Sequence, residues 1–247
     1  MQKYPMVVIA HRGDHTQVPE NTIASYQHAI AVGADYVEVD LRTTSDGHLV
    51  VMHDETVDRM TNGSGKVKEL SYKTIRSLKV ADKSKPGSAS FRVPSFEEVL
   101  NTCKGRINIY LDFKDADVKT VYSLLKSKGM DKHVAVYINA ESHYTDWKNI
   151  APAVPLISSI PGFRKQVNQL ISFLDKFQVS AIDGSPGDYD EEMMSVIRKR
   201  NVQVWLDVQE KIETPEYWNP ILETKVDGMQ SDHPGELVRF LKQKGLH

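Results

Sequence analysis

The sequence alternates between two hydrophobic patterns along most of its length. Short apolar runs typical of buried strands are followed by segments in which apolar residues recur every three or four positions, as on one face of a helix. We expect strands within residues 7–14, 37–41, 107–114, 134–138, 156–159, 180–184, 202–208 and 227–231. We expect a helix after each strand, within residues 21–33, 95–103, 118–129, 143–152, 164–177, 191–201, 215–223 and 236–245. Eight such units in 247 residues predict an α/β fold, the TIM (β/α)8 barrel.

One segment interrupts this alternation, between the second strand and the second helix. Residues 55–94 contain turn sequences (NGSGK and KPGSAS), one short helical pattern (LSYKTIRSL) and no strong core pattern. We expect an insertion at about residues 43–94 within a single domain that spans residues 1–247. An open doubly wound sheet is the structural alternative, but the chain lacks the Gly-rich phosphate fingerprint of that fold, which favours a closed barrel.

Residues 36–54 carry the most specific chemical pattern. Strand side chains alternate between two faces, so Glu38 and Asp40 share one face while apolar neighbours share the other. The sequence SDGH predicts a tight turn, after which the run LVVMHD returns the chain with His53 at its end. This hairpin is expected to bring an imidazole back toward the pair of acids.

Glu38 and Asp40 are a candidate metal site. Two carboxylates held side by side repel each other, so one of them must bind a proton or a cation. Carboxylate oxygens suit hard divalent ions such as Mg²⁺ and Ca²⁺. The alternative is an exposed strand face on which both acids are simply solvated.

Barrel geometry predicts which other side chains join these acids, because active sites of TIM barrels lie at the carboxyl ends of the strands. On the third strand, alternation directs Asp112 and Lys114 into the barrel. The side chains expected at this rim are His11, Arg12, Glu38, Asp40, His53, Asp112, Lys114, Trp205, Asp207, Ser231 and Asp232. Acids, histidines and cations together suit metal-assisted attack on an anionic phosphoester, in which the imidazoles move protons.

The start of the first helix brings two further polar residues, Glu20 and Asn21, close to this rim. The first strand delivers His11 and Arg12 at its end, and the sequence PENT then opens a helix, with Asn21 as the expected N-cap. Glu20 and Asn21 either cap this helix or orient Arg12 or His11. The sequence leaves both interpretations open.

Composition excludes several classes of function. The formal net charge is −2, and Lys and Arg are scattered, so a nucleic-acid partner is not expected. The apolar run MVVIA is too short for a signal peptide, and no run approaches membrane-spanning length. We expect a soluble protein, cytoplasmic, or periplasmic or secreted if an export segment has been removed. The single cysteine, Cys103, is expected to be a buried structural residue of a helix.

The motifs HRGD, PENT, EVD and HLVVMHDETVDRMTNGSG resemble, in this order, the glycerophosphodiester phosphodiesterase family. The resemblance extends to the closing DGMQSDHP. It implies a TIM barrel with a small insertion, one divalent metal ion (Mg²⁺ or Ca²⁺), and hydrolysis of glycerophosphodiesters, such as glycerophosphocholine, to sn-glycerol 3-phosphate and an alcohol. It also implies that His11 and His53 are the acid/base pair and that Glu38, Asp40 and Asp112 bind the metal.

Two positions depart from the family pattern. The family more often has Glu where YLDFK places Asp112, and the shorter side chain changes the reach of the third carboxylate. The family's WTVN is replaced by WLDV, which keeps Trp205 and adds Asp207. Asp207 is expected either to bind substrate hydroxyls or waters of the metal, or to be a solvated or structurally paired acid. We assign Arg12, Lys114, Trp205 and Asp207 to substrate binding.

Two rival functions remain. A phospholipase of the phosphatidylinositol-specific type would use two histidines at the same rim, but the polar insertion offers no apolar loop for a membrane. A non-catalytic phosphoester-binding barrel gains little from three acids in its pocket. The sequence leaves open the headgroup, the metal, the division of roles between the histidines, attack by water against a cyclic phosphate intermediate, and the oligomeric state.

Overall fold

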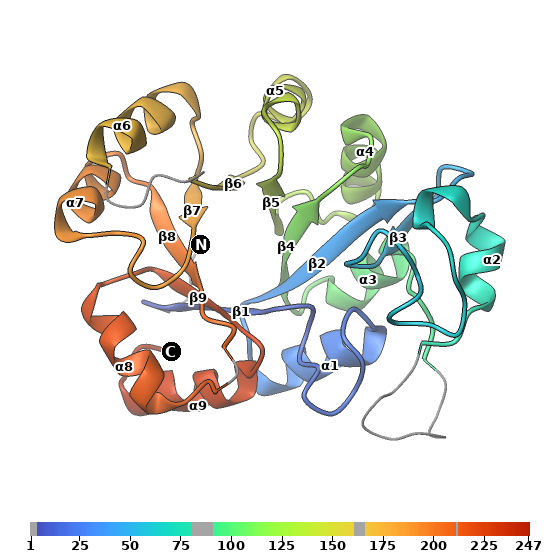
Figure 1. The fold of residues 1–247 in the computed structure, drawn as a ribbon, viewed down its shortest axis with the longest axis horizontal. Helices are drawn as coiled ribbons and strands as arrows, with labels where there is room; N and C mark the ends of the chain where they lie inside the picture. The colour runs from blue at the N-terminus through green and yellow to red at the C-terminus, as the bar shows by residue number, and fades with distance from the viewer. Residues whose placement is uncertain (1–3, 81–90, 161–165, 211) are drawn as a thin grey trace.

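The computed structural model describes residues 4–80, 91–160, 166–210 and 212–247. Eight parallel strands form a closed barrel (Figure 1), because β1 pairs with both β2 and β9. The strands are β1 (Val7–Ala10), β2 (Tyr36–Thr43), β4 (Asn108–Phe113), β5 (Val134–Ile138), β6 (Leu156–Ser159), β7 (Ala181–Asp183), β8 (Gln203–Asp207) and β9 (Gly228–Ser231). The predicted TIM barrel is therefore confirmed, and the open sheet is excluded.

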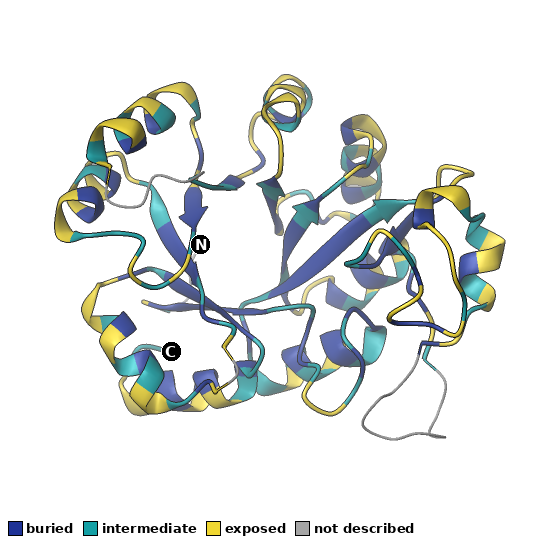
Figure 2. Ribbon diagram, in the orientation of Figure 1, coloured by how far each residue is buried: buried dark blue, intermediate teal, exposed yellow. Residues whose placement is uncertain are grey.

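One helix follows each barrel strand and covers its outer side. These helices are α1 (Ile23–Val32), α3 (Phe96–Cys103), α4 (Val118–Lys128), α5 (Glu141–Ile150), α6 (Val167–Lys176), α7 (Glu191–Lys199), α8 (Pro215–Glu223) and α9 (Pro234–Gln243). Their inner faces are buried and their outer faces are exposed (Figure 2). Cys103 is fully buried in α3, as expected. The first two residues of the predicted helix at 164–177, and the turn predicted at 85–90, lie outside the described residues.

Strand alternation divides the side chains between two cores. Outward residues such as Val39 and Leu111 pack against the helices in the main core. Inward residues from the lower part of the strands fill the barrel, and they are Val7, Ile9, Tyr110, Ala135, Ile157, Ala181 and Trp205. The barrel interior is thus packed below its upper rim, which leaves room for a polar site at the carboxyl ends of the strands, where active sites of this fold lie.

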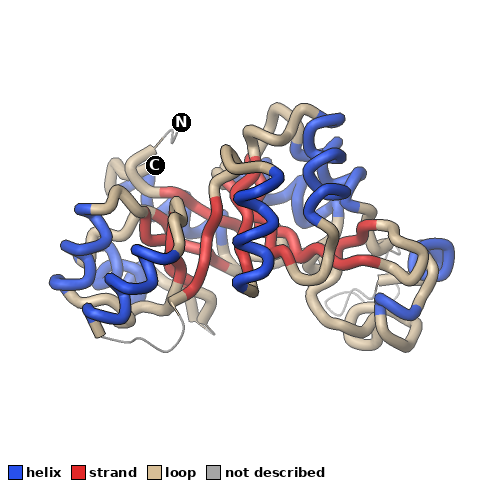
Figure 3. The backbone as a smooth tube through the Cα atoms, turned by 90° about the horizontal axis from the view of Figure 1, so that it is seen from above, coloured by secondary structure: helices blue, strands red, loops and turns tan. Residues whose placement is uncertain are grey.

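A hairpin carries the chain out of the barrel after β2. Strand β3 (Leu49–Val51) pairs antiparallel with β2, and the turn between them contains Gly47 at φ +80°, as the Asp-Gly sequence predicts. The segment that follows holds the 3₁₀ helix η1 (Val67–Glu69) and the short helix α2 (Tyr72–Ser77). In Figure 3 this loop-rich segment lies beside the barrel, at the end of the two hairpin strands.

The insertion has a small core of its own, so the expectation of no strong core pattern was wrong. Its buried residues are Val50, Met52, Val57, Met60, Val67, Ile75, Val80 and Val93. They come from β3, η1, α2 and the turns between them, so they share no single helical or strand period, and for this reason the sequence pattern did not reveal them. That the barrel and this segment form one domain stays a prediction.

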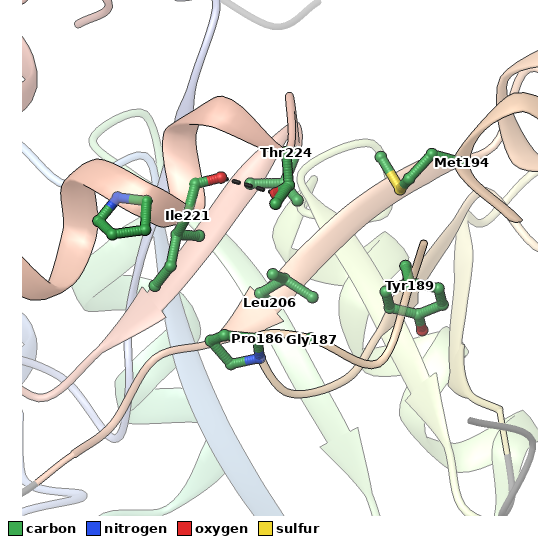
Figure 4. Close-up of a pocket in the computed structure, with 9 residues that line it drawn as sticks. Pro186, Gly187, Tyr189, Met194, Leu206, Ile221 and Thr224 are labelled. Atoms are coloured by element: carbon green, nitrogen blue, oxygen red, sulfur yellow. Dashed lines mark hydrogen bonds between the residues drawn. The ribbon is translucent and has the colours of Figure 1, made fainter. Parts of the chain in front are cut away.

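A small apolar cavity lies where α7 and α8 leave part of the outer face of β8 uncovered (Figure 4). Its volume is about 180 Å³, and Met194, Leu206 and Ile221 contribute apolar side chains to its wall. The hydroxyl of Thr224 donates to the carbonyl of Ile221 at 2.6 Å, which satisfies the hydroxyl at the cavity edge. No charged residue lines the cavity among the described residues, so we assign it to packing of the helical layer.

Candidate active site

A polar pocket of about 150 Å³ opens at the carboxyl ends of the barrel strands. The register of the sheet explains its composition, because Asp40 pairs with Asp112, Asp112 with Tyr137, and Ser159 with Asp183. Inward side chains from near the carboxyl ends of neighbouring strands therefore line the pocket together. The residues lining the pocket are His11, Arg12, Glu38, Asp40, His53, Tyr110, Asp112, Tyr137, Ser159, Asp183, Asp207 and Gln230.

Three carboxylates converge in this pocket. One oxygen from each of Glu38, Asp40 and Asp112 lies within 4.8 Å of the other two. Glu38 and Asp40 are only 4% and 1% exposed, so their mutual repulsion is little reduced by water. The alternative that both acids are solvated on an exposed face is wrong.

The charges around the three acids are unequal. Burial, followed by the charges of Asp40 and Asp112, raises the pKa of Glu38 well above its usual range. Burial also acts to raise the pKa of Asp40, but the positive charges of Lys114 and Arg12 outweigh it and lower that pKa. The three carboxyl groups thus outnumber the two neighbouring cations, Lys114 and Arg12, that could neutralise them.

Lys114 and Arg12 approach the acids from two sides. The Lys114 ammonium lies 2.5 Å from Asp112 Oδ2 and 3.1 Å from Asp40 Oδ1. The Arg12 backbone N–H donates to Glu38 Oε2 at 2.9 Å, and its Nε lies 3.5 Å from Asp40 Oδ2. Arg12 Nε is buried without a hydrogen-bond partner, which leaves a donor available beside the acids.

The donor set fits a hard divalent cation. All three groups offer carboxylate oxygens, which suit Mg²⁺ and Ca²⁺, and a buried carboxyl with a raised pKa is the environment that a cation would relieve. The structure thus brings together the three acids that the sequence assigned to a metal. Their role as ligands stays a prediction.

Each candidate histidine is held by an aspartate. His11 Nδ1 lies 2.6 Å from Asp232 Oδ1, and His53 Nδ1 lies 2.7 Å from Asp54 Oδ1. When Nδ1–H donates to the carboxylate, Nε2 is the ring nitrogen left to exchange a proton with a substrate. Asp232 is shared, because His15 Nε2 lies 3.1 Å from the same oxygen.

A network of ion pairs joins the sides of the site that carry Arg12 and His53. Arg12 Nη1 donates to Glu20 Oε1 at 2.9 Å, and Arg59 donates to Glu20 and to Asp54 at 2.7 and 2.6 Å. The hydrogen bond from Arg59 is the main reason why the pKa of Asp54 lies far below its usual range. Glu20 therefore orients Arg12, and its alternative role as a helix cap is not observed.

A model of the glycerophosphoryl diester phosphodiesterase family matches residues 11–236 of this chain. The chain belongs to this family. The glycerophosphodiester phosphodiesterase of Caldanaerobacter subterraneus subsp. tengcongensis is 30% identical over 97% of this chain and 99% of its own length. The enzyme of that name from Bacillus subtilis is 31% identical over 80% of this chain and 74% of its own length.

Solved structures of the family have the same fold. The crystal structure of the glycerophosphodiester phosphodiesterase from Agrobacterium tumefaciens superposes with a TM-score of 0.83 at 26% identity and covers 95% of this chain and 99% of that one. The predicted class of enzyme, a phosphodiesterase, is therefore confirmed. Within the parts of the chain that the structure describes, no helix combines the length and hydrophobicity needed to cross a membrane.

Asn21 does not cap the first helix of this phosphodiesterase, so that prediction was wrong. Thr22 is the N-cap, and its hydroxyl accepts from the backbone N–H of Ser25. Asn21 has φ +53°, a left-handed conformation that asparagine tolerates better than most residues. Its Nδ2 donates to Asp40 Oδ2 at 2.7 Å, and its Oδ1 accepts from the Tyr26 hydroxyl at 2.7 Å. Asn21 thus orients one acid of the candidate metal site.

The wall opposite the three acids contains polar residues that the sequence reasoning missed. Asp183, on β7, accepts from the hydroxyls of Tyr110 and Ser159 at 3.2 and 2.5 Å. Burial, followed by the charge of Asp207, raises the pKa of Asp183 to about 7. Asp207 itself accepts from Gln230 Nε2 at 2.6 Å and lines the pocket. The paired-acid interpretation of Asp207 is therefore observed, and a contact with substrate stays a prediction.

Trp205, which the sequence assigns to substrate binding, does not line the polar pocket at the rim. It belongs to the packed interior of the barrel, where its ring contacts those of Tyr36 and Tyr110, and it is only 5% exposed. It lines a different pocket, at the end of the barrel where the strands begin. Trp205 alternates in phase with Asp207 but lies one layer lower, so the structure does not place it beside the candidate active site.

Glu213 supports the end of β9 and gives a testable dependence of stability on pH. Its carboxylate accepts from the Ser231 hydroxyl and from the Asp232 backbone N–H, the latter at 2.8 Å. Burial raises the pKa of Glu213 to about 7 from its ordinary 4.5. Between these values the folded protein keeps a proton that the unfolded chain releases, so this group destabilises the fold increasingly as pH rises.

The substitution Glu213→Gln is expected to remove this contribution. The decrease in Tm between about pH 5 and about pH 8 should be smaller in the variant than in the wild type, because the amide does not titrate. Thermal unfolding of both proteins at the two pH values measures this difference. An identical change of Tm with pH in both proteins would show that Glu213 does not titrate in this range.

Proposed function

We propose that this chain hydrolyses glycerophosphodiesters to sn-glycerol 3-phosphate and an alcohol, with the aid of one divalent metal ion, Mg²⁺ or Ca²⁺. One observation carries the proposal: the pocket at the barrel rim contains three converging carboxylates together with two histidines, each of which has an aspartate at Nδ1. The names of the curated relatives agree with this substrate class.

In this mechanism Glu38, Asp40 and Asp112 would hold the metal ion. The ion supplies Lewis-acid stabilisation of the charge on the phosphoryl oxygens when it is bound. Lys114 neutralises part of the charge of Asp40 and Asp112, with which it pairs. Asn21 and the backbone of Arg12 keep the acids oriented by donating to Asp40 and Glu38.

Arg12 is the residue proposed to bind the phosphoryl group. Its guanidinium is fixed by Glu20, which in turn is held by Arg59, so its position is determined before substrate arrives. A guanidinium presents several N–H donors that match phosphate oxygens and keeps its charge at any working pH. Preorganised charge of this kind stabilises the transition state without reorganisation.

His11 and His53 are proposed to transfer the protons. One imidazole accepts a proton from the nucleophile, which is water or the glycerol 2-hydroxyl, and the other donates a proton to the oxygen of the leaving alcohol. If the 2-hydroxyl attacks first, water then opens the resulting cyclic phosphate, with the two histidines exchanging their proton-transfer roles, to give sn-glycerol 3-phosphate. Both groups line the pocket, from β1 and from the segment after β3. The His53 backbone is fixed by Arg42, whose Nη2 donates to the His53 carbonyl at 2.6 Å.

Asp232 is proposed to position His11, and Asp232→Asn is expected to lower kcat by about 10-fold to 10²-fold with little change in KM. The amide keeps the shape but removes the negative charge that orients and stabilises the imidazolium formed during the reaction. Steady-state kinetics with glycerophosphocholine measure the two constants. Asp232→Glu should recover part of the loss, whereas a merely structural role would give no such recovery. A rise in KM with unchanged kcat would contradict the positioning role.

Product analysis tests the function itself. The enzyme is expected to release choline from glycerophosphocholine and to leave intact phospholipid in vesicles unchanged. Among the described residues, Ile212 is the one large apolar side chain that is exposed, which gives little surface for a membrane. Turnover of intact lipid would favour a phospholipase, and binding without turnover, insensitive to EDTA, would favour a non-catalytic module.

A further inference from the structure

A second pocket adjoins the candidate active site between β5 and β6. Its volume is about 400 Å³, and it shares Tyr137 and Ser159 with the catalytic pocket. Asn139, which also lines it, donates through Nδ2 to Asp112 Oδ1 at 2.7 Å. The two pockets are therefore neighbours around the same carboxylate cluster, and the second is the larger.

A phosphodiester has two organic halves that extend from opposite sides of phosphorus. With phosphorus at the carboxylate cluster, the catalytic pocket of about 150 Å³ is small beside the adjoining pocket of about 400 Å³, which leaves the larger pocket for one of the two halves. The Tyr137 and Ser159 hydroxyls, 2.6 Å apart, form the boundary beyond which the second pocket begins. To enter the second pocket, this half of the diester would pass over these two hydroxyls, which line both pockets.

The lining of the second pocket is suited to an ammonium group. Tyr137, Phe173 and Phe177 contribute aromatic rings, and Glu141, in the first turn of α5, contributes a carboxylate. The protein's own Lys176 ammonium already lies 2.7 Å from Glu141 Oε2 and 5.0 Å from the centroid of the Phe177 ring. An ammonium is therefore stabilised here by an aromatic face and an opposite charge.

The lysine is not tightly held in this position. The side chains of Glu141 and Lys176 are 62% and 56% exposed, and exposed ion pairs contribute little because water and salt screen them. The Lys176 side chain can therefore leave Glu141 and move into solvent at a small cost in free energy, because holding it in the ion pair restricts its rotamers. A ligand bound through its phosphoryl group would hold an ammonium near Glu141 without restricting a lysine side chain.

We propose that this second pocket receives the alcohol half of the substrate and selects alcohols that carry a cationic amine, such as choline. Glu141 and Phe177 bind the ammonium, and Lys176 competes with it for the same position. The inference rests on the proposed function, because it takes the phosphoryl group to bind at the carboxylate cluster. Glu141 and Phe177 are thus proposed to favour binding of a cationic headgroup, and Lys176 to oppose it.

The proposal predicts that substitutions of Glu141 and Lys176 change the KM for glycerophosphocholine in opposite directions. Glu141→Gln is expected to raise the KM for glycerophosphocholine about 5-fold, because the carboxylate partner of the ammonium is lost. Lys176→Gln is expected to lower that KM about 3-fold, because the internal competitor is removed. With glycerophosphoglycerol, whose alcohol is uncharged, both variants should stay within about 2-fold of the wild type.

A matched control uses a similar ion pair elsewhere. Glu97 lies in the first turn of α3 and pairs with Lys128 at 2.5 Å, so Glu97→Gln makes the same chemical change at a comparable helix position. It should leave both KM values unchanged. Normal turnover of glycerophosphoglycerol by the Glu141 and Lys176 variants would also show that they fold.

Two outcomes overturn the inference. Equal changes for charged and uncharged substrates, or a higher KM for glycerophosphocholine in Lys176→Gln, would show that the pocket does not select an ammonium. If the wild type hydrolyses neither diester, the proposed function fails, and calorimetric binding of glycerophosphocholine and glycerophosphoglycerol then tests the pocket separately. Equal affinity of wild type and Glu141→Gln for glycerophosphocholine would reject it.

Discussion

Replacement of His11 or His53 by alanine is expected to lower kcat for glycerophosphocholine by about 10²-fold to 10⁴-fold, the range that general acid–base catalysis supplies. The physical reason is that each imidazole acts on a different proton. His11 follows β1 and is held by Asp232, whereas His53 follows β3 and is held by Asp54, so neither ring can take over the other's position.

His48→Ala is the matched control for these two variants. His48 lies in the β2–β3 turn region, where it stacks on Tyr72 and does not line the pocket, so kcat should be unchanged. Metal binding by the His11 and His53 variants should also be retained, because neither ring belongs to the carboxylate cluster. Activity within a few-fold of the wild type in either variant would contradict the acid/base assignment.

Loss of the metal is the second large effect expected. EDTA should abolish turnover, and Mg²⁺ or Ca²⁺ should restore it, because the charge on the phosphoryl oxygens is no longer offset without a cation. In Glu38→Gln the affinity for the ion should fall by at least about 10²-fold, since one charged ligand becomes a neutral amide of the same shape.

Thermal unfolding distinguishes a role of Glu38 in metal binding from a role in the stability of the metal-free protein. A ligand that binds only the folded state raises Tm, so Mg²⁺ or Ca²⁺ should raise the Tm of the wild type. That rise should be lost in Glu38→Gln, while the metal-free variant should be no less stable than the metal-free wild type. Burial and two neighbouring acids already disfavour a charge on Glu38, so its removal costs the ion-free protein little.

The exposed Glu191 provides a control for this substitution, because it lies at the start of α7, away from the pocket. Glu191→Gln should keep the full increase in Tm with the ion. A normal increase in Glu38→Gln, or activity that survives EDTA, would contradict the metal assignment.

The fold and the carboxylate cluster could be predicted from sequence because both follow from short-range periodicity. The period of two in a strand places Glu38 and Asp40 on the inner face, and the same rule places Asp112 there. The parallel pairing of β2 with β4 then brings Asp112 opposite Asp40. Alternation along each strand and the order of the strands therefore suffice to predict that these three acids lie at one end of the barrel.

The supporting contacts could not be predicted in this way. Arg59 lies in an irregular loop, yet it joins Glu20 to Asp54, and Asp232 contacts His11 from the far end of the chain. Such pairs depend on loop paths, which local patterns do not determine. The residue type of Asn21 favours a helix cap, whereas its side chain instead donates to Asp40, a contact that no local pattern predicts.

Asp183 shows a different limitation. The strand pattern SAIDG predicts the strand but does not by itself place Asp183 at the rim, although Asp183 has the same phase as Ala181 and lines the pocket. Trp205 shows the converse, since a side chain can share the inward phase of the strand and still lie below the site. Depth in the barrel, which depends on register, decides between these cases.

The most direct test is a crystal structure with Mn²⁺, which takes the same oxygen ligands as Mg²⁺, and with sn-glycerol 3-phosphate. The account predicts an anomalous peak bound by Glu38, Asp40 and Asp112, with the phosphate beside Arg12 and between His11 and His53. An ion held by other residues, or a phosphate bound away from both histidines, would contradict it.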